Sequence, residues 1–313
     1  MSYQPSIGLI LQPRDHDLLA ALATHRFLRS DHVHALLFAE SSWRVTQRRL
    51  RLLWQHKLVD RLFVPAVLDG RHQPLIPPRQ PVYTLSSKGA TLVAERTGST
   101  HDGDRTPQPF SLQTLEHQLV VSEFMVALVV AGRRRSDLRL EVSHEWALWH
   151  ALSAKTRKRE GVIVPDGAFT LSLPDGKSVT FCLEIVRAGT KGGNRRFAAK
   201  LAHYAELNRA GFFRDTYGFE RVRAVLVLTT SSARAQSLRS AASTLRHSRG
   251  LFWFGSYLSP QQDGFAIAAS SLFSNSWSTA SGERVSLASA LGRQHQPPCT
   301  NLSPHPGTIP ASS

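Results

Sequence analysis

The chain has few cysteines, fewer acidic than basic residues, and no long apolar run. Only two of its 313 residues are cysteines, Cys182 and Cys299. That number is too small for a disulfide framework or a cysteine-based zinc site, and it suits a reducing cytoplasm. The first residues show no basic leader followed by an apolar core, and the longest apolar stretch, 124–132, is far shorter than the ~20 residues of a membrane span. We therefore expect a soluble cytoplasmic protein with no membrane partner.

The shortage of acidic residues leaves a large positive charge. Thirty-eight Lys and Arg residues stand against 23 Asp and Glu residues, which gives a formal net charge of +15. Such a charge attracts polyanions through counterion release, and duplex DNA or RNA is the commonest such partner. A basic surface that serves solubility alone is the alternative. The hydrophobic content of 42% is enough for a sizeable core.

Composition divides the chain into four regions. Residues 12–96 alternate helical and strand patterns and predict one folded domain. The polar stretch 97–109 is typical of an exposed linker. Residues 110–269 form a second predicted domain, and residues 270–313, rich in Ser and Pro, predict a largely disordered tail.

The N-terminal domain shows the element order of a winged helix-turn-helix. Periodicity predicts three helices and then two strands, over residues 15–27, 31–38, 43–57, 58–64 and 81–85. A basic loop that follows a third helix and joins two strands is the wing of that fold, which contacts the DNA backbone or minor groove. Here the loop carries Arg71 and Arg79.

The third predicted helix has two distinct faces. Its apolar face contains Trp43, Leu50, Leu53 and Trp54, and its opposite face contains Arg44, Arg48, Arg51 and Gln55. Arginine can bind guanine with two hydrogen bonds or contact phosphates, and glutamine can pair with adenine. A solvated helix face is the alternative for an isolated helix, but its position before a basic hairpin favours DNA recognition.

The second domain predicts an α/β order of helix, three strands, helix, strand, helix and strand, and therefore a mixed sheet flanked by helices. The predicted ranges are 110–131, 138–146, 162–173, 178–186, 195–209, 221–229, 233–246 and 251–255 in that order. Asp166 follows Pro165 on one strand and Glu184 lies on the next, an arrangement that resembles the core of PD-(D/E)xK nucleases. That resemblance implies that Asp166 and Glu184 bind Mg²⁺ beside a scissile phosphate. The basic residues Arg157, Lys158 and Arg159 are further candidates for DNA contact.

One position departs from the nuclease pattern. The lysine expected two residues after the glutamate is replaced by Val186, which cannot stabilise phosphoryl charge. Lys200 on the following helix is the candidate substitute, and Glu116, Glu123 and Glu145 are candidate further carboxylates. The alternative is structural: Asp166 ends a turn and Glu184 faces solvent from an edge strand. Any enzyme activity is thus expected to be that of a degenerate metal-dependent nuclease.

Residues 12 to about 230 together resemble the replication-relaxation family of bacterial plasmids and mobile elements. The resemblance rests on several short motifs, namely Arg14-Asp15, the stretch 83–89, His117, Pro165-Asp166, Leu183-Glu184, Thr190 and the pair Lys200 and Tyr204. It implies a role in plasmid replication or in the relaxation of DNA for replication or mobilisation. Family members read Glu-x-Asp where this chain has Glu184 and Val186.

Three functions follow as hypotheses. The leading one is a DNA-binding accessory protein of plasmid or mobile-element replication or mobilisation, non-catalytic or weakly catalytic, with double-stranded DNA and plasmid replication or mobilisation proteins as partners. The second is a Mg²⁺-dependent PD-(D/E)xK nuclease or nickase, for which Mg²⁺ is the candidate cofactor. The third is a winged-helix transcriptional regulator. Val186 disfavours the second hypothesis, and the paired acids Asp166 and Glu184 disfavour the third.

Overall fold

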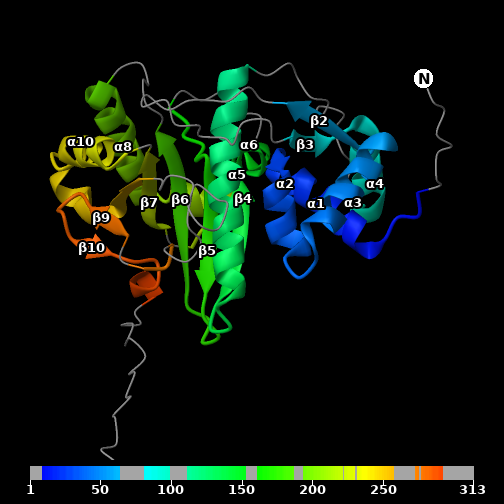
Figure 1. The fold of residues 1–313 in the computed structure, drawn as a ribbon. Coiled ribbons are helices and arrows are strands. Elements are labelled where there is room, and N and C mark those ends of the chain that lie inside the picture. The colour runs from blue at the N-terminus through cyan, green and yellow to red at the C-terminus, as the bar shows by residue number, and fades with distance from the viewer. Residues whose placement is uncertain are drawn as a thin grey trace, which may run out of the picture.

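The protein folds into two units that meet at one long helix. The computed structural model describes residues 9–63, 81–98, 111–152, 161–186, 193–220, 222–229, 231–256, 272–274 and 276–291. Within these ranges the structure is mixed α/β, which confirms the predicted fold class. Figure 1 shows the N-terminal unit in blue on one side of helix α5 (Leu112–Arg133) and a large sheet on the other.

The N-terminal unit packs helices against a small antiparallel sheet with the strand order β1-β3-β2. Its elements are α1 (Pro13–His25), β1 (Leu28–Arg29), α2 (Ser30–Val33), η1 (His34–Phe38), α3 (Trp43–Gln55), β2 (Val59–Phe63), β3 (Pro81–Leu85) and α4 (Ser87–Thr97). Leucines of α1 and α3 fill its core, as their helical spacing predicts. The second predicted helix is divided, because η1 continues α2 as a π-helix.

The C-terminal unit is built on a seven-stranded mixed sheet with the order β10-β9-β8-β7-β6-β5-β4. Its elements after α5 are β4 (Arg139–His144), α6 (Glu145–Ala151), β5 (Gly167–Ser172), β6 (Ser178–Val186), α8 (Gly193–Arg209), α9 (Phe212–Tyr217), β7 (Val222–Thr229), α10 (Ser232–Ala242), η3 (Arg246–Leu251), β8 (Phe252–Ser256), β9 (Trp277–Thr279), β10 (Arg284–Val285) and η5 (Ser289–Leu291). Strands β6, β7 and β8 run parallel, and the outer pairs run antiparallel.

Strand β6 supplies side chains to both faces of the sheet. Phe181, Leu183 and Ile185 pack in the cluster that contains α5, whereas Cys182 and Val186 pack in the cluster that contains α8 and α10. This is the alternation expected along a strand buried on both faces. Glu184 therefore points toward α8, and it is buried rather than solvent-facing as the structural alternative assumed.

Helix α5 belongs to the cores of both units. Phe124 packs on the sheet, with its ring centroid 6.2 Å from that of Phe169. Leu115 and Leu119 pack instead with Phe27 and other residues of the N-terminal unit. By length and composition alone α5 could cross a membrane, yet 67% of its most apolar window is buried inside the protein. Burial between the two units accounts for that apolar composition.

Several predicted element boundaries are wrong. The strand expected over 138–146 ends at His144, because the amide of Glu145 donates to the carbonyl of Asp166 where α6 begins. The strand expected over 162–173 begins at Gly167. Helices α4 and α9 have no counterpart in the prediction; α9 has only six residues between two glycines with left-handed φ angles.

The predicted disordered tail is wrong over its first part. Residues 276–291 contain β9 and β10, which extend the sheet at its far edge, and the short 3-10 helix η5. Trp277 and Leu287 are buried in the main core, so two large apolar side chains anchor a stretch whose average composition is polar. Residues 292–313 lie outside the described residues.

Candidate nucleic-acid interface and acidic cluster

Helix α3 presents its predicted basic face to solvent. Arg44, Arg48, Arg51 and Gln55 are all exposed, and none of the three arginines forms an ion pair within the described part of the chain. Positively charged groups that lack an internal partner keep their full attraction for an external polyanion. The remaining candidate DNA contacts (Arg71, Arg79, Arg157, Lys158 and Arg159) lie outside the described residues.

The apolar face of α3 is narrower than its sequence predicts. Leu50 and Leu53 are fully buried, but Trp43 and Trp54 are 43% and 38% exposed. The ring of Trp43 contacts His34 edge to face, and Trp54 lies under the guanidinium of Arg61 on β2. Both tryptophans thus border the basic face rather than fill the core.

A buried ion pair fixes α3 against α1. The carboxylate of Asp15 is almost fully buried and accepts a hydrogen bond from Nε of Arg49 at 2.8 Å. The same carboxylate accepts the backbone N–H of Gln12 at 2.7 Å and so caps the start of α1. Arg49 on the inner side of α3 is therefore structural, in contrast to the outward arginines.

The segment that ends β3 and begins α4 holds the C-terminal end of α3. Ser86 caps α4 by accepting the amide of Gly89, and its hydroxyl donates to the carbonyl of Lys57 at 2.6 Å. A Cβ atom at Gly89 would collide with the backbone carbonyl of Leu58. Glycine is thus required here by close backbone approach. This contact explains physically the Ser-Ser-Lys-Gly motif of residues 86–89.

The acidic residues predicted from the second domain come together between α5, β5, β6 and α8. One carboxylate oxygen of Asp166 accepts the amide of Ile185 at 2.7 Å, and the other lies 3.1 Å from Nε2 of His117. Glu184 accepts Nζ of Lys200 at 2.5 Å on one oxygen and the hydroxyl of Tyr204 on the other. All four carboxylate oxygens therefore already have partners within the chain.

Burial and mutual repulsion shift the titration of this cluster. Burial, with a smaller contribution from the charge of Asp166, raises the pKa of Glu184 to about 7 against the opposing attraction of Lys200 and the hydrogen bond of Tyr204. Burial alone would lower the pKa of Lys200, but the charges of Glu184 and Asp166 outweigh it and raise that pKa. The pKa of His117 is also raised, because its hydrogen bond and attraction to Asp166 outweigh burial.

Glu145 extends the cluster toward α6, whereas Glu123 does not belong to it. The carboxylate of Glu145 accepts the side-chain amide of Gln118 at 2.7 Å. Burial raises its pKa, and the charge of Asp166 adds to that increase. Glu123 lies instead at the contact between the two units. His117 and Tyr204 were signalled in the sequence by the family motifs, whereas nothing in the pattern identified Gln118.

The cluster does not fit a preformed Mg²⁺ site. Within the described residues, no group of three or more His, Cys, Asp or Glu side chains is placed to hold a metal ion. Mg²⁺ prefers several unshared oxygen ligands in near-octahedral geometry. The oxygens of Asp166 and Glu184 are engaged by His117, Lys200, Tyr204 and a backbone amide, so no catalytic step through a metal follows from this arrangement.

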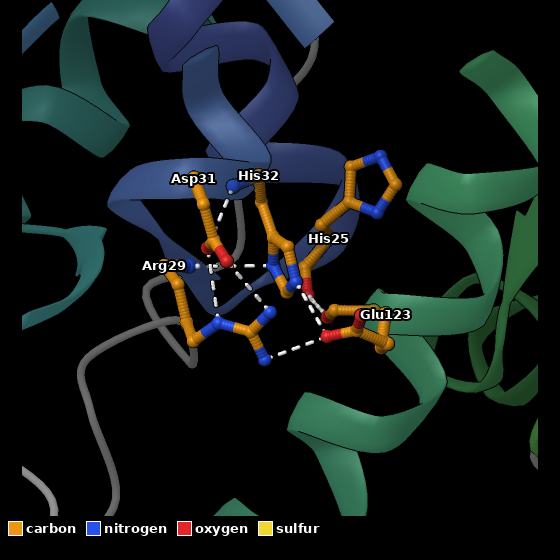
Figure 2. Close-up of polar contacts among 6 residues, drawn as sticks. His25, Arg29, Asp31, His32 and Glu123 are labelled. Atoms are coloured by element: carbon orange, nitrogen blue, oxygen red, sulfur yellow. Dashed lines mark hydrogen bonds and ion pairs between the residues drawn. The ribbon is translucent and has the colours of Figure 1, made fainter. Parts of the chain in front are cut away.

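A buried ionic network joins the two units. Figure 2 shows the guanidinium of Arg29 between the carboxylates of Asp31 and Glu123, with His32 beside them. Nη1 of Arg29 lies 2.6 Å from Glu123 of α5, and Nε2 of His32 lies 2.9 Å from the same oxygen. Burial alone would raise the pKa of Glu123, but the charge of Arg29 and the hydrogen bond of His32 lower it to about 2. No sequence pattern links residues so far apart in the chain.

Two buried histidines lie at the same contact. His25 at the end of α1 packs edge to face on His144 at the end of β4, with ring centroids 4.4 Å apart. Nδ1 of His25 and Nε2 of His144 have no hydrogen-bond partner in the described part of the protein. Burial lowers the pKa of His144 to about 4, and it lowers that of His25 with help from His144. Both rings are therefore neutral near pH 7.

The fold and these sites define a basic mixed α/β protein with an arginine-faced helix and a partnered acidic cluster. The family model described as replication-relaxation matches residues 19–222, which is more than half of the chain. The protein therefore belongs to the replication-relaxation family, and membership indicates a role connected with replication or mobilisation. The matched range includes the 83–89 stretch and the whole acidic cluster. Comparison with curated proteins and with solved structures found no match.

Proposed function

We propose that this protein is a DNA-binding accessory factor for the replication or mobilisation of a plasmid or other mobile element. The observation that carries the proposal is the solvent-exposed face of α3, where three arginines without ion-pair partners in the described residues stand beside Gln55. Arginine and glutamine are the residues that read purine edges in the major groove. Replication or mobilisation proteins of the same element are proposed as further partners, in the cytoplasm.

The element order of the N-terminal unit supports this role for α3. Helix α1, strand β1, helix α2 with η1, helix α3 and the antiparallel pair β2-β3 follow one another as in a winged helix-turn-helix. In that fold the third helix enters the major groove and the hairpin contacts the backbone. Fixation of α3 to α1 through Asp15 and Arg49 would give the reading face a defined orientation.

A binding experiment with charge-matched variants tests the proposal. Fluorescence anisotropy with duplexes from the element's own origin region should give a higher affinity for one duplex than for random DNA. The triple variant R44A/R48A/R51A should abolish that preference, since each base-reading arginine is worth about 1–3 kcal/mol. The control variant R139A/R214A/R284A removes the same charge from exposed positions on β4, α9 and β10 and should retain the preference. Equal affinities of the two triple variants would refute α3 as the reader.

A nuclease function remains the second candidate because Asp166, Glu184 and Lys200 converge. The order α5, β4, α6, β5, β6, α8, β7 and the change from antiparallel to parallel pairing at β6 support this candidate, because a PD-(D/E)xK core is expected to have a helix before such a mixed sheet. Nicking of supercoiled plasmid with and without Mg²⁺ tests it, with Asp166→Ala as the variant. An active enzyme loses Mg²⁺-dependent nicking in this variant and keeps DNA binding. Because the carboxylates are already partnered, we expect no nicking by either protein.

A further inference from the structure

Exposed apolar side chains gather beside the basic face of α3. Seven large apolar side chains in the described residues are exposed, and four of them lie on α3 or β2, namely Trp43, Val45, Trp54 and Phe63. Exposed aromatic groups on a protein surface are typical of binding sites when they occur together. Their concentration on two neighbouring elements therefore indicates a binding site.

Three of the residues in this region form a defined stack. Cζ of Arg61 lies 4.0 Å from the ring centroid of Trp54 and 5.0 Å from that of Phe63. Arg61 and Phe63 share one face of β2 because they are two residues apart along the strand. Arg61 also lies directly opposite Tyr83 in the register of the antiparallel strands β2 and β3. Phe63 is 62% exposed, so the stack remains open to solvent at that end.

The stack adjoins the proposed reading face. Trp54 follows Arg51 by one turn of α3, so the indole borders the row of exposed arginines. A second copy of this chain is a poor occupant, because it would bring a like-charged arginine face against this one. A polyanion that also has flat apolar faces can pair with the arginines and stack on the aromatic side chains. Unpaired bases on a DNA strand have both properties.

We propose that Trp54, Arg61 and Phe63 form a stacking platform for unpaired bases of a DNA strand next to a duplex held by α3. This inference rests on the proposed DNA-binding function and deepens it, since it assigns the protein a preference for locally opened duplex. Every base has a π-face, so aromatic side chains bind unpaired bases with little sequence selectivity. Arg61, already held over the indole, adds a planar cation at the same site.

Two forms of one duplex test the platform. One is fully paired, and the other carries a short unpaired bubble at its centre. We expect the wild-type protein to bind the bubble form about tenfold more tightly by fluorescence anisotropy. The variant W54A/F63A should bind both forms with the affinity that the wild type shows for the paired one. Trp54→Phe preserves a stacking ring and should keep most of the preference. Trp149→Ala, which removes an equally exposed tryptophan from α6, should leave it unchanged.

The outcomes separate this inference from the proposed function. Tight binding of the paired duplex without any bubble preference overturns the platform and leaves α3 as a duplex reader. A bubble preference that persists in W54A/F63A assigns the unpaired bases to another surface and also overturns the platform. Binding to neither form, with the circular dichroism of a folded protein, overturns both proposals. Bubble preference lost only in the platform variant supports both.

Discussion

Burial lowers the pKa of His144 and raises the pKa of Glu184, so the two residues make the stability of the protein depend on pH in opposite directions. The folded pKa of His144 is about 4, below its ordinary value, so the unfolded chain binds the extra proton as the pH falls. Stability from this residue is complete above pH 6.5 and is lost as the pH falls toward 4. The folded pKa of Glu184 is about 7, above its ordinary value, so its contribution is lost as the pH rises from 4.5 through 7.

Replacement of His144 by phenylalanine should make the free energy of unfolding less dependent on pH between pH 6.5 and 4. The ring of His144 is buried and its Nε2 has no partner in the described residues, so Phe removes a titrating group without breaking a hydrogen bond there. A pKa shift of this size corresponds to about 3 kcal/mol between pH 6.5 and 4. Urea unfolding across this pH range should show a shallower slope for the variant. An unchanged slope would mean that His144 does not carry the effect.

Replacement of Lys200 by methionine should shift the titration of Glu184 upward. Lys200 is the cation that opposes the effects of burial and of Asp166 on this carboxylate. Its loss should raise the pKa of Glu184 above about 7, and the shift is measurable by NMR of the labelled side-chain carboxyl. Lys177→Met is a control, because that ammonium pairs with Asp175 at an exposed turn. A lower pKa in K200M would contradict the described pairing.

At the scale of elements, the junction of β3 with α4 depends on the absence of a side chain. Gly89→Ala would push a methyl group into the carbonyl of Leu58 and should destabilise the protein by about 1–3 kcal/mol. Gly250→Ala is the matched control, because a Cβ there meets nothing within 4 Å. Thermal unfolding of the two variants provides the comparison. Equal melting temperatures would show that α4 can move away at little cost.

The end of the sheet supplies a second test at this scale. A chain that stops after residue 291 retains β9, β10 and η5 and should melt like the full chain. A chain that stops after residue 275 loses the buried Trp277 and Leu287 and should be destabilised by more than about 3 kcal/mol. Circular dichroism melts of the two truncations provide the measurement. Similar melting temperatures would contradict a core role for these residues.

The elements that the sequence predicted well are those with strong periodicity. The leucines of α1 and the largely apolar run of β6 have patterns that reflect burial directly, and both lie where the sequence placed them. Element ends such as His144 depend on a single tertiary hydrogen bond to Asp166, which no local pattern contains. The acidic cluster was predicted in part, because the resemblance to nuclease cores brings Asp166, Glu184 and Lys200 together. The hydrogen bonds that Lys200 and Tyr204 donate to Glu184 depend on three-dimensional packing.

At the scale of the whole molecule, the two units are joined by α5 and by direct polar contacts between their side chains and backbone. Nε1 of Trp146 donates to the carbonyl of Thr24 at 2.7 Å, and Arg133 of α5 donates to the carbonyl of Leu36. The network of Arg29, His32 and Glu123 lies in the same contact. Shared burial of this kind predicts that both units unfold in one transition.

Weakening the network at Glu123 should split this single unfolding transition into two, one for each unit. Glu123→Gln keeps the shape of the side chain but leaves the buried Arg29 without one of its two carboxylates, which costs about 3–5 kcal/mol in comparable buried pairs. The lost stabilisation is that of the contact between the two units. Urea unfolding followed by far-ultraviolet circular dichroism and by tryptophan fluorescence should therefore give midpoints that no longer coincide. Glu141→Gln removes one partner of an exposed pair with Arg139 and should change stability by less than about 1 kcal/mol with coincident midpoints. If E123Q also unfolds with coincident midpoints at the wild-type urea concentration, the apolar packing of α5 alone holds the units together.

Because the pKa of Glu123 is about 2, the wild-type protein should approach the behaviour of this variant only as the pH falls from 4.5 toward 2.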